Sequence, residues 1–228
     1  MRVLAIETAT EACSAALWED AVVCTRYKVA PRQHAELILP MIEALLAEAG
    51  WSRSSLQAVA FGRGPGSFTG VRLAASVTQG IAFGLDLAVA RVSTLQAMAR
   101  RAWREHAAEQ VLAAIDARMR EVYWGAYLVD PQGGVTPQSE ERVIAPADVP
   151  LPQSGTWMGV GTGWASYREL LCERAETLLS GIDGTLLPSA EDIAELGGEQ
   201  LRRGEGVAPE QAIPVYLRDN VAVKPGKR

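Results

Sequence analysis

The sequence has few of the residues that disulfide scaffolds, zinc sites and export signals need. Its three cysteines have no C-x-x-C spacing, so they predict no disulfide framework and fit a reducing compartment. Two histidines, His34 and His106, leave little material for a zinc site. The first apolar run already ends at Glu7, which is too short for a signal peptide. We therefore expect a cytoplasmic protein without a membrane segment.

An excess of charge of either sign is also lacking. The 22 basic and 27 acidic residues give a net charge of −5, so the chain has no field that would gather nucleic acid or anionic lipid by itself. Hydrophobic residues make up 48% of the 228 residues and charged residues 21%, which excludes wholesale disorder. This length predicts one large domain or two small lobes.

In the first half, short apolar runs alternate with helical stretches. The predicted strands are 3–7, 13–18, 22–27, 58–61 and 88–92, and the predicted helices are 34–49, 71–84 and 94 to about 104. The order βββαβαβα predicts a mostly parallel α/β sheet with an antiparallel three-strand start.

The second half begins in a similar way. A strand over 110–115 ends at Asp116, as the first strand ends at Glu7, and a further apolar strand over 122–129 follows. Later elements are a strand at 157–160, a helix at 191–203 and an ordered segment at 214–218. The recurrence suggests a duplicated lobe, although an apolar run that ends in an acid also arises by chance.

A glycine-rich segment, residues 62–70, links a predicted strand to a predicted helix. Glycines at a helix N-terminus can cradle phosphate, but the segment matches neither the P-loop nor the dinucleotide motif. Pro65 and Thr69 stand where a nucleophile elbow around Ser67 would need glycines. The favoured interpretation is a tight corner with Ser67 or Thr69 as the helix cap.

Glu7 and Asp116 are candidate ligands for a magnesium ion between nucleotide phosphates. Neither is followed by a glycine, so close approach of the backbone to phosphate is hindered. Acids that cap turns are the alternative. With Gly161 and Gly163 they outline at most a vestigial nucleotide cleft.

The first two helices have more apolar surface than one sheet face can cover. The apolar arc of helix 34–49 spans roughly 220°, against about 100° for a surface helix. Leaving about 400 Å² of this apolar surface exposed to solvent costs on the order of 10 kcal/mol of folding free energy. Cover comes either from the second lobe or from a partner chain. The predicted partner-binding residues on the two helices are Leu37, Met41, Leu45, Val71, Ala75, Thr78 and Ala82.

Three sequence runs resemble the TsaB (YeaZ-like) family of the bacterial tRNA threonylcarbamoyladenosine machinery. They are Leu4-Ala5-Ile6-Glu7-Thr8-Ala9, then His34-Ala35-Glu36 with Leu39-Pro40, and Gly64-Pro65-Gly66-Ser67-Phe68-Thr69-Gly70-Val71-Arg72. Ile115-Asp116-Ala117-Arg118 with Glu121-Val122-Tyr123 is similar to the opening of that family's second lobe. The glycine-rich run is the most specific part of the resemblance.

The resemblance implies an actin-like (ASKHA) fold: an α/β protein of two duplicated ribonuclease-H-like lobes, with mixed sheets flanked by helices. It assigns residues 1–106, with the C-terminal segment from about 207 to 228 returning, to the first lobe, and 107–206 to a smaller second lobe. It also implies a TsaD-like catalytic partner, which attaches threonylcarbamoyl to adenosine 37 of tRNAs that read codons starting with A.

Further partners implied are a TsaE-like ATPase and, in isolation, a second copy of the chain, with tRNA reached only through the complex. The catalytic relative has two metal-binding histidines at i and i+4, and the matching positions here hold Thr94 and Met98. The chain is therefore expected to have no catalytic residue, no metal and no cofactor of its own, with ATP or ADP at most at a complex interface. The alternative is a stand-alone small-molecule kinase or ATPase of the same fold class, with nucleotide between Glu7, Asp116 and the glycines near 161–163.

Overall fold

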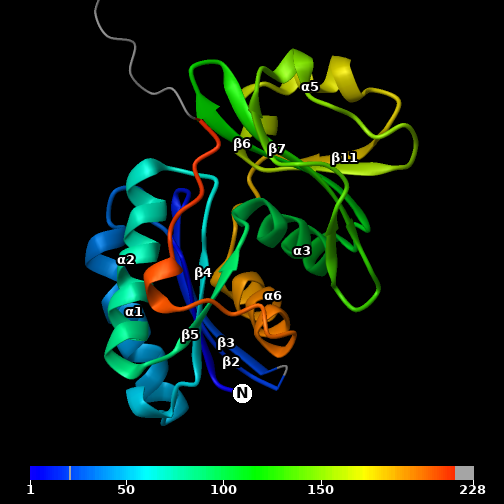
Figure 1. Cartoon of the computed structure of the whole chain (residues 1–228). Coiled ribbons are helices and arrows are strands. Elements are labelled where there is room, and N and C mark those ends of the chain that lie inside the picture. The colour runs from blue at the N-terminus through cyan, green and yellow to red at the C-terminus, as the bar shows by residue number, and fades with distance from the viewer. Residues whose placement is uncertain (21, 219–228) are drawn as a thin grey trace, which may run out of the picture.

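The structure, a computed structural model, describes residues 1–20 and 22–218 and has two lobes, each built around one β-sheet (Figure 1). The last ten residues of the predicted returning segment, 219–228, lie outside the described residues. The sequence prediction of a two-lobed α/β protein with mixed sheets is confirmed.

The first half of the chain follows the predicted order of elements. These are β1 (Val3–Glu7), β2 (Ala12–Glu19), β3 (Val22–Val29), α1 (His34–Ala49), the single turn η1 (Arg53–Ser55), β4 (Ala58–Gly62), α2 (Phe68–Leu85), β5 (Ala88–Val92) and α3 (Thr94–His106). Helix α2 begins three residues earlier than predicted, because Ser67 and not a later residue caps it.

The second half adds three strands and two short helices that the sequence did not predict. Its elements are β6 (Gln110–Arg118), β7 (Glu121–Val129), β8 (Val135–Pro137), β9 (Arg142–Ile144), η2 (Pro146–Asp148), β10 (Trp157–Val160), α4 (Thr162–Ser166), α5 (Arg168–Ala175), β11 (Leu179–Asp183), α6 (Ala190–Arg202) and η3 (Pro209–Gln211). β7 begins one residue earlier than predicted, and β10 has the predicted bounds. The strands β8, β9 and β11 were not predicted because their segments have too few apolar residues to be recognised.

The two sheets have the same topology, which confirms the predicted duplication. The first sheet has the order β3-β2-β1-β4-β5, and the second has β8-β7-β6-β10-β11. In each sheet the first three strands are antiparallel, the fourth pairs in parallel with the first, and the fifth pairs in parallel with the fourth. The second sheet has one further strand, β9, which pairs antiparallel with β7. Glu7 and Asp116 therefore lie near the ends of equivalent strands, β1 and β6.

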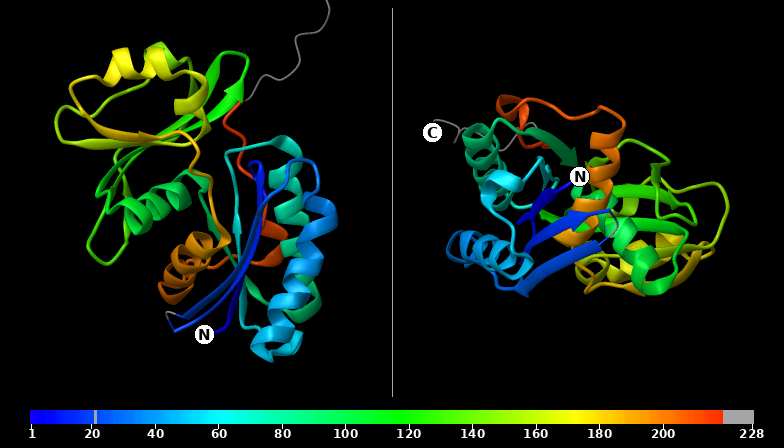
Figure 2. Two further views of the ribbon diagram at one scale, coloured as in Figure 1. Left: turned by 180° about the vertical axis from the view of Figure 1, so that it is seen from behind. Right: turned by 90° about the horizontal axis from the view of Figure 1, so that it is seen from below.

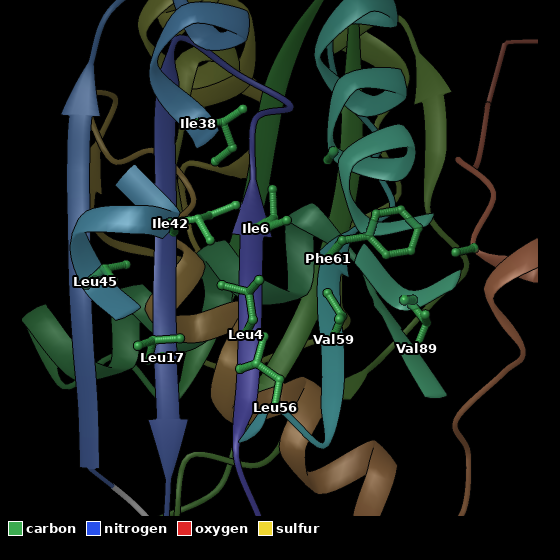
Figure 3. Close-up of a cluster of buried hydrophobic side chains, with 14 of the residues drawn as sticks. Leu4, Ile6, Leu17, Ile38, Ile42, Leu45, Leu56, Val59, Phe61 and Val89 are labelled. Atoms are coloured by element: carbon green, nitrogen blue, oxygen red, sulfur yellow. The ribbon is translucent and has the colours of Figure 1, made fainter. Parts of the chain in front are cut away.

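Helices α1 and α2 cover one face of the first sheet (Figure 1). In α1 the buried positions Ile38, Ile42, Leu45 and Leu46 recur at helical spacing. Figure 3 shows Ile38, Ile42 and Leu45 pointing toward the sheet. Gly50 ends the helix in the left-handed region with a φ of 65°. The sheet residues beneath them, including Leu4, Ile6 and Phe61, are fully buried.

The opposite face of the first sheet is covered by α6, which the sequence analysis placed in the second lobe. Figure 2 shows α6 and the α1–α2 pair on opposite sides of the sheet. Ile193 and Ala194 of α6 pack in one core with Trp18 and Val92. Gly197 permits this approach, since a Cβ there would lie 2.5 Å from that of Ala60.

Helix α3 is placed in the opposite sense, because it covers the sheet of the second lobe. It follows β5 of the first sheet, yet Leu95, Met98 and Ala102 pack against Val111 and Tyr127 of the second sheet. The predicted lobe boundaries at 106 and 206 are therefore both displaced by one helix. Each of these helices has an apolar face that only the other lobe's sheet can bury.

No helix in residues 1–20 and 22–218 combines the length and the hydropathy that crossing a bilayer requires.

Candidate functional site

The glycine-rich segment forms the predicted corner between β4 and α2. The Ser67 hydroxyl accepts a hydrogen bond from the Gly70 N–H at 3.0 Å, and the Ser67 N–H donates to the Ala9 carbonyl at 2.7 Å. A Cβ on Gly66 would lie 2.4 Å from that same Ala9 oxygen. The glycines are thus needed for close packing against the β1–β2 turn, and the space that a phosphate would need there is filled by protein.

Gly70→Ala tests this close packing. A Cβ at position 70 would lie 2.0 Å from the Thr8 carbonyl oxygen, and we expect a loss of about 1–3 kcal/mol in unfolding free energy from overpacking. Gly80→Ala on the same helix is the control, because no atom lies within 4 Å of the added Cβ and alanine raises helix propensity. Urea titration of both variants measures the difference. Equal stability of the two would contradict the packing argument.

Glu7 is fully buried in the first lobe. Its carboxylate accepts hydrogen bonds from the Ala9 N–H at 2.5 Å and from the Thr94 hydroxyl at 3.1 Å. Burial raises the pKa of Glu7 to about 7, and the hydrogen bonds to Ala9, Thr94 and Thr8 oppose that rise. A carboxylate enclosed in this way is a structural group and not an open metal ligand.

Asp116 is held by its own turn. Arg118 donates to it twice, from the backbone N–H and from the guanidinium, each at 2.8 Å, and the Tyr167 hydroxyl donates at 3.2 Å. The Arg118 guanidinium also lies 3.9 Å from Glu11 of the first lobe. Arg118 thus lies between the β6–β7 turn of the second lobe and the equivalent β1–β2 turn of the first lobe, close to an acid from each.

Three consecutive residues at this turn, Arg118, Met119 and Arg120, have a positive φ of 53–63°. This conformation is unfavourable for side chains with a Cβ, and glycine would adopt it freely. The turn presents Met119, which is 72% exposed, to solvent.

The two glycines of the predicted cleft are also packed against protein. A Cβ on Gly161 would lie 2.3 Å from the Met98 methyl group, and one on Gly163 would lie 2.8 Å from the Ala114 Cβ. Open grooves of about 390 and 330 Å³ occur elsewhere, and none of the four predicted cleft residues lines either of them. The residues present therefore do not fit a magnesium–nucleotide complex, because the carboxylates are engaged and the glycines are covered.

The positions that match the catalytic relative's histidines lie in this packed region. Thr94 and Met98 are fully buried on α3, where Thr94 donates to Glu7 and Met98 meets Gly161. Within the described residues, no group of three or more His, Cys, Asp and Glu side chains is placed to hold a metal ion.

Five of the seven predicted partner-binding residues are in the chain's own core. Leu45, Val71, Ala75, Thr78 and Ala82 are at most 4% exposed, which corrects their assignment to an outer face. The helical pattern was apolar on more than one side, and it gave no means of deciding which side meets the sheet.

The other two predicted residues, Leu37 and Met41, are half-buried at the edge of that core. The large apolar residues that the two helices do expose are Leu39 at 52%, Phe68 at 56% and Phe83 at 59%. Small residues Ser76 and Gly80 lie between the two phenylalanines on the exposed side of α2. We call Leu39, Ser76, Gly80 and Phe83 the outer helix face. On α2 these positions lie opposite the buried residues Val71, Ala75, Thr78 and Ala82, whereas Leu39 lies within the apolar arc of α1 and no signal in the sequence separates it from the core.

The fold defines a two-lobed α/β protein in which each lobe is built on a mixed sheet of the same basic strand order. Residues 27–225 match the family model described as "TsaD: tRNA N6-adenosine threonylcarbamoyltransferase". The tRNA threonylcarbamoyladenosine biosynthesis protein TsaB of Escherichia coli K12 is 48% identical over 232 residues, covering 100% of both chains. The TsaB protein of Haemophilus influenzae is 40% identical, covering 100% of this chain and 98% of its own.

A solved structure, YeaZ from Pseudomonas aeruginosa, superimposes with a TM-score of 0.89 at 49% identity and covers 95% of this chain and 99% of its own. The chain belongs to the TsaB (YeaZ-like) family, as the sequence motifs predicted.

Proposed function

We propose that this chain acts in the biosynthesis of threonylcarbamoyladenosine in tRNA, as a non-catalytic partner of a TsaD-like transferase that modifies adenosine 37 of tRNAs reading codons that start with A. The printed names of its relatives supply the process. The observation that carries the partner role is the outer helix face, whose large apolar side chains are exposed. The non-catalytic role is supported by an interlobe region whose carboxylates are engaged.

The outer helix face has the composition of a helix-docking surface. Leu39 and Phe83 are each more than half exposed, and single large apolar side chains of this kind become anchors when a partner covers them. Ser76 and Gly80 between the phenylalanines leave room for a crossing helix to approach α2 closely. We propose that this face binds the TsaD-like subunit and, in isolation, a second copy of the chain.

The remaining partners belong to the same proposal. A TsaE-like ATPase joins the complex, tRNA is bound through the complex, and ATP or ADP binds at an interface of the complex and not to this chain alone. A cytoplasmic location is part of the proposal, because the substrate named for the relatives is tRNA.

Leu39→Glu and Phe83→Glu should each weaken pairing with a TsaD-like subunit by about 30-fold or more, since truncating or charging an anchor costs at least about 2 kcal/mol. Isothermal calorimetry with the purified subunits measures the change. Leu170→Glu on α5 is the matched control, because Leu170 is 45% exposed in the other lobe, and its affinity should stay unchanged. If all three variants bind like the unmodified chain, the outer helix face is not the docking site.

The alternative function, a stand-alone kinase or ATPase, makes the opposite prediction for the isolated chain. It requires micromolar Mg-ATP binding and turnover, whereas Glu7, Asp116 and the two glycines are occupied by protein contacts. Calorimetry of the isolated chain with Mg-ATP separates the two, and turnover at a useful rate would refute the non-catalytic role.

A further inference from the structure

Three side chains form an exposed aromatic and cationic cluster at the start of α2. The Arg72 guanidinium lies 3.5 Å from the centroid of the Phe68 ring and 5.6 Å from that of Tyr216, and its Nε donates to the Tyr216 hydroxyl at 2.8 Å. The two ring centroids are 5.8 Å apart with an interplanar angle of 41°. We call Phe68, Arg72 and Tyr216 the aromatic platform.

The platform is exposed although each of its parts is held in place. Phe68 is 56% and Tyr216 44% exposed. The segment that carries Tyr216 runs from the first lobe to the second. In Figure 1 it is the red segment that passes beside the upper end of α2. It is fixed at one end by the Val215 N–H, which donates to the Arg63 carbonyl at 2.8 Å, and at the other by the ion pair of Arg218 with Glu121. Ring faces that are already positioned lose little entropy when a ligand stacks on them.

The electrostatics at this end of α2 favour an anion. Among the described residues, Arg72 forms no ion pair with a carboxylate, and its hydrogen-bond partner is the Tyr216 hydroxyl. The 18 residues of α2 include no acidic side chain, so no acid on this helix compensates the charge of Arg72.

We propose that the aromatic platform binds single-stranded RNA, with a nucleobase stacked on the exposed ring faces and an adjacent phosphate at the Arg72 guanidinium. Stacking on aromatic side chains beside a cationic backbone contact is how single-stranded nucleic acid is held without an apolar pocket. This inference rests on the proposed function, which supplies an RNA substrate, and it gives this chain a direct contact with that RNA. The platform is about 22 Å along α2 from Phe83, so the RNA contact and the outer helix face are separable.

The test is fluorescence anisotropy of a short, labelled single-stranded RNA with the full chain at low salt, where weak phosphate contacts are measurable. Phe68→Leu should weaken binding about tenfold, because stacking contributes on the order of 1–3 kcal/mol per base. Arg72→Gln should weaken binding and lower the slope of log affinity against log salt by about one. Tyr27→Leu removes another exposed ring over which an arginine lies, with the Arg101 guanidinium 4.8 Å from its centroid, and should leave RNA affinity unchanged.

Absence of RNA binding by the unmodified chain would overturn the proposal, as would equal effects of Phe68→Leu and Tyr27→Leu. Capture of a TsaD-like subunit by Phe68→Leu is measured in parallel. If that substitution abolishes capture and leaves RNA affinity intact, the platform is a protein contact and the RNA assignment is wrong. Loss of capture by the outer-face variants concerns the proposed function alone and leaves the RNA result to stand by itself.

Discussion

Leu45→Glu should unfold the first lobe and not merely block an interface. Leu45 is 2% exposed and packs with Ile42 and Leu17 over the first sheet (Figure 3). The substitution removes a buried side chain, which costs about 2–5 kcal/mol, and places a carboxyl group in an apolar core without a partner. Since whole domains are stable by only about 5–15 kcal/mol, we expect loss of most of the native far-UV circular dichroism at 25 °C.

Leu39→Glu is the matched comparison on the same helix. Leu39 is 52% exposed, so the same change of side chain should alter the unfolding free energy by less than about 0.5 kcal/mol while pairing is lost. The two variants therefore separate a folding defect from a docking defect. A Leu45→Glu protein with native stability and no partner binding would show that α1 turns its Leu45 side outward, and it would restore the interface predicted from the sequence.

Glu7→Gln should make the chain more stable above pH 7 and change its pH dependence. The pKa of Glu7 is raised by burial from 4.5 to about 7, so the folded state holds a proton that the unfolded state releases. The stability this confers is complete below pH 4.5 and is lost as the pH rises through 7. The shift corresponds to about 3 kcal/mol, because each pKa unit is 1.36 kcal/mol.

The measurement is the difference in unfolding free energy between the unmodified chain and Glu7→Gln, taken from urea titrations between pH 4 and 8. That difference should fall by about 3 kcal/mol across the range. Using the difference removes the contribution of Asp192, whose pKa burial raises to about 6 against the opposing effect of Arg104. A pH-independent difference would mean that the Glu7 carboxylate is hydrated and open, as a ligand for magnesium would have to be.

The occupied interlobe region explains how one fold class can serve both catalysis and partnership. The equivalent turns after Glu7 and Asp116 are present, but Arg118 neutralises Asp116 and Met98 fills the space beside Gly161. Chemistry in a fold depends on the side chains at its site, and the proposed non-catalytic role rests on this occupied region. The proposed function and the proposed RNA contact therefore depend on two surfaces, the outer helix face and the aromatic platform.

The sequence by itself determined the elements of the first lobe and the duplication. Its apolar runs alternate with helical periodicity, and Gly50 ends α1 as expected, because these patterns depend on residues close together in the chain. It also determined the corner at Ser67, since a hydroxyl before a helix caps that helix locally.

Only the tertiary structure decided which sides of α1 and α2 meet the sheet and which sheet each of α3 and α6 covers. Leu45 and Leu39 are equally apolar, and no local rule tells a core position from an exposed one when both flank the same stripe. The exchange of α3 and α6 between lobes, and the meeting of Arg72 with Tyr216 across 144 residues, depend on contacts between distant segments. Such contacts form because each apolar face is buried by whichever surface the chain's topology brings to it, and that is a property of the whole fold.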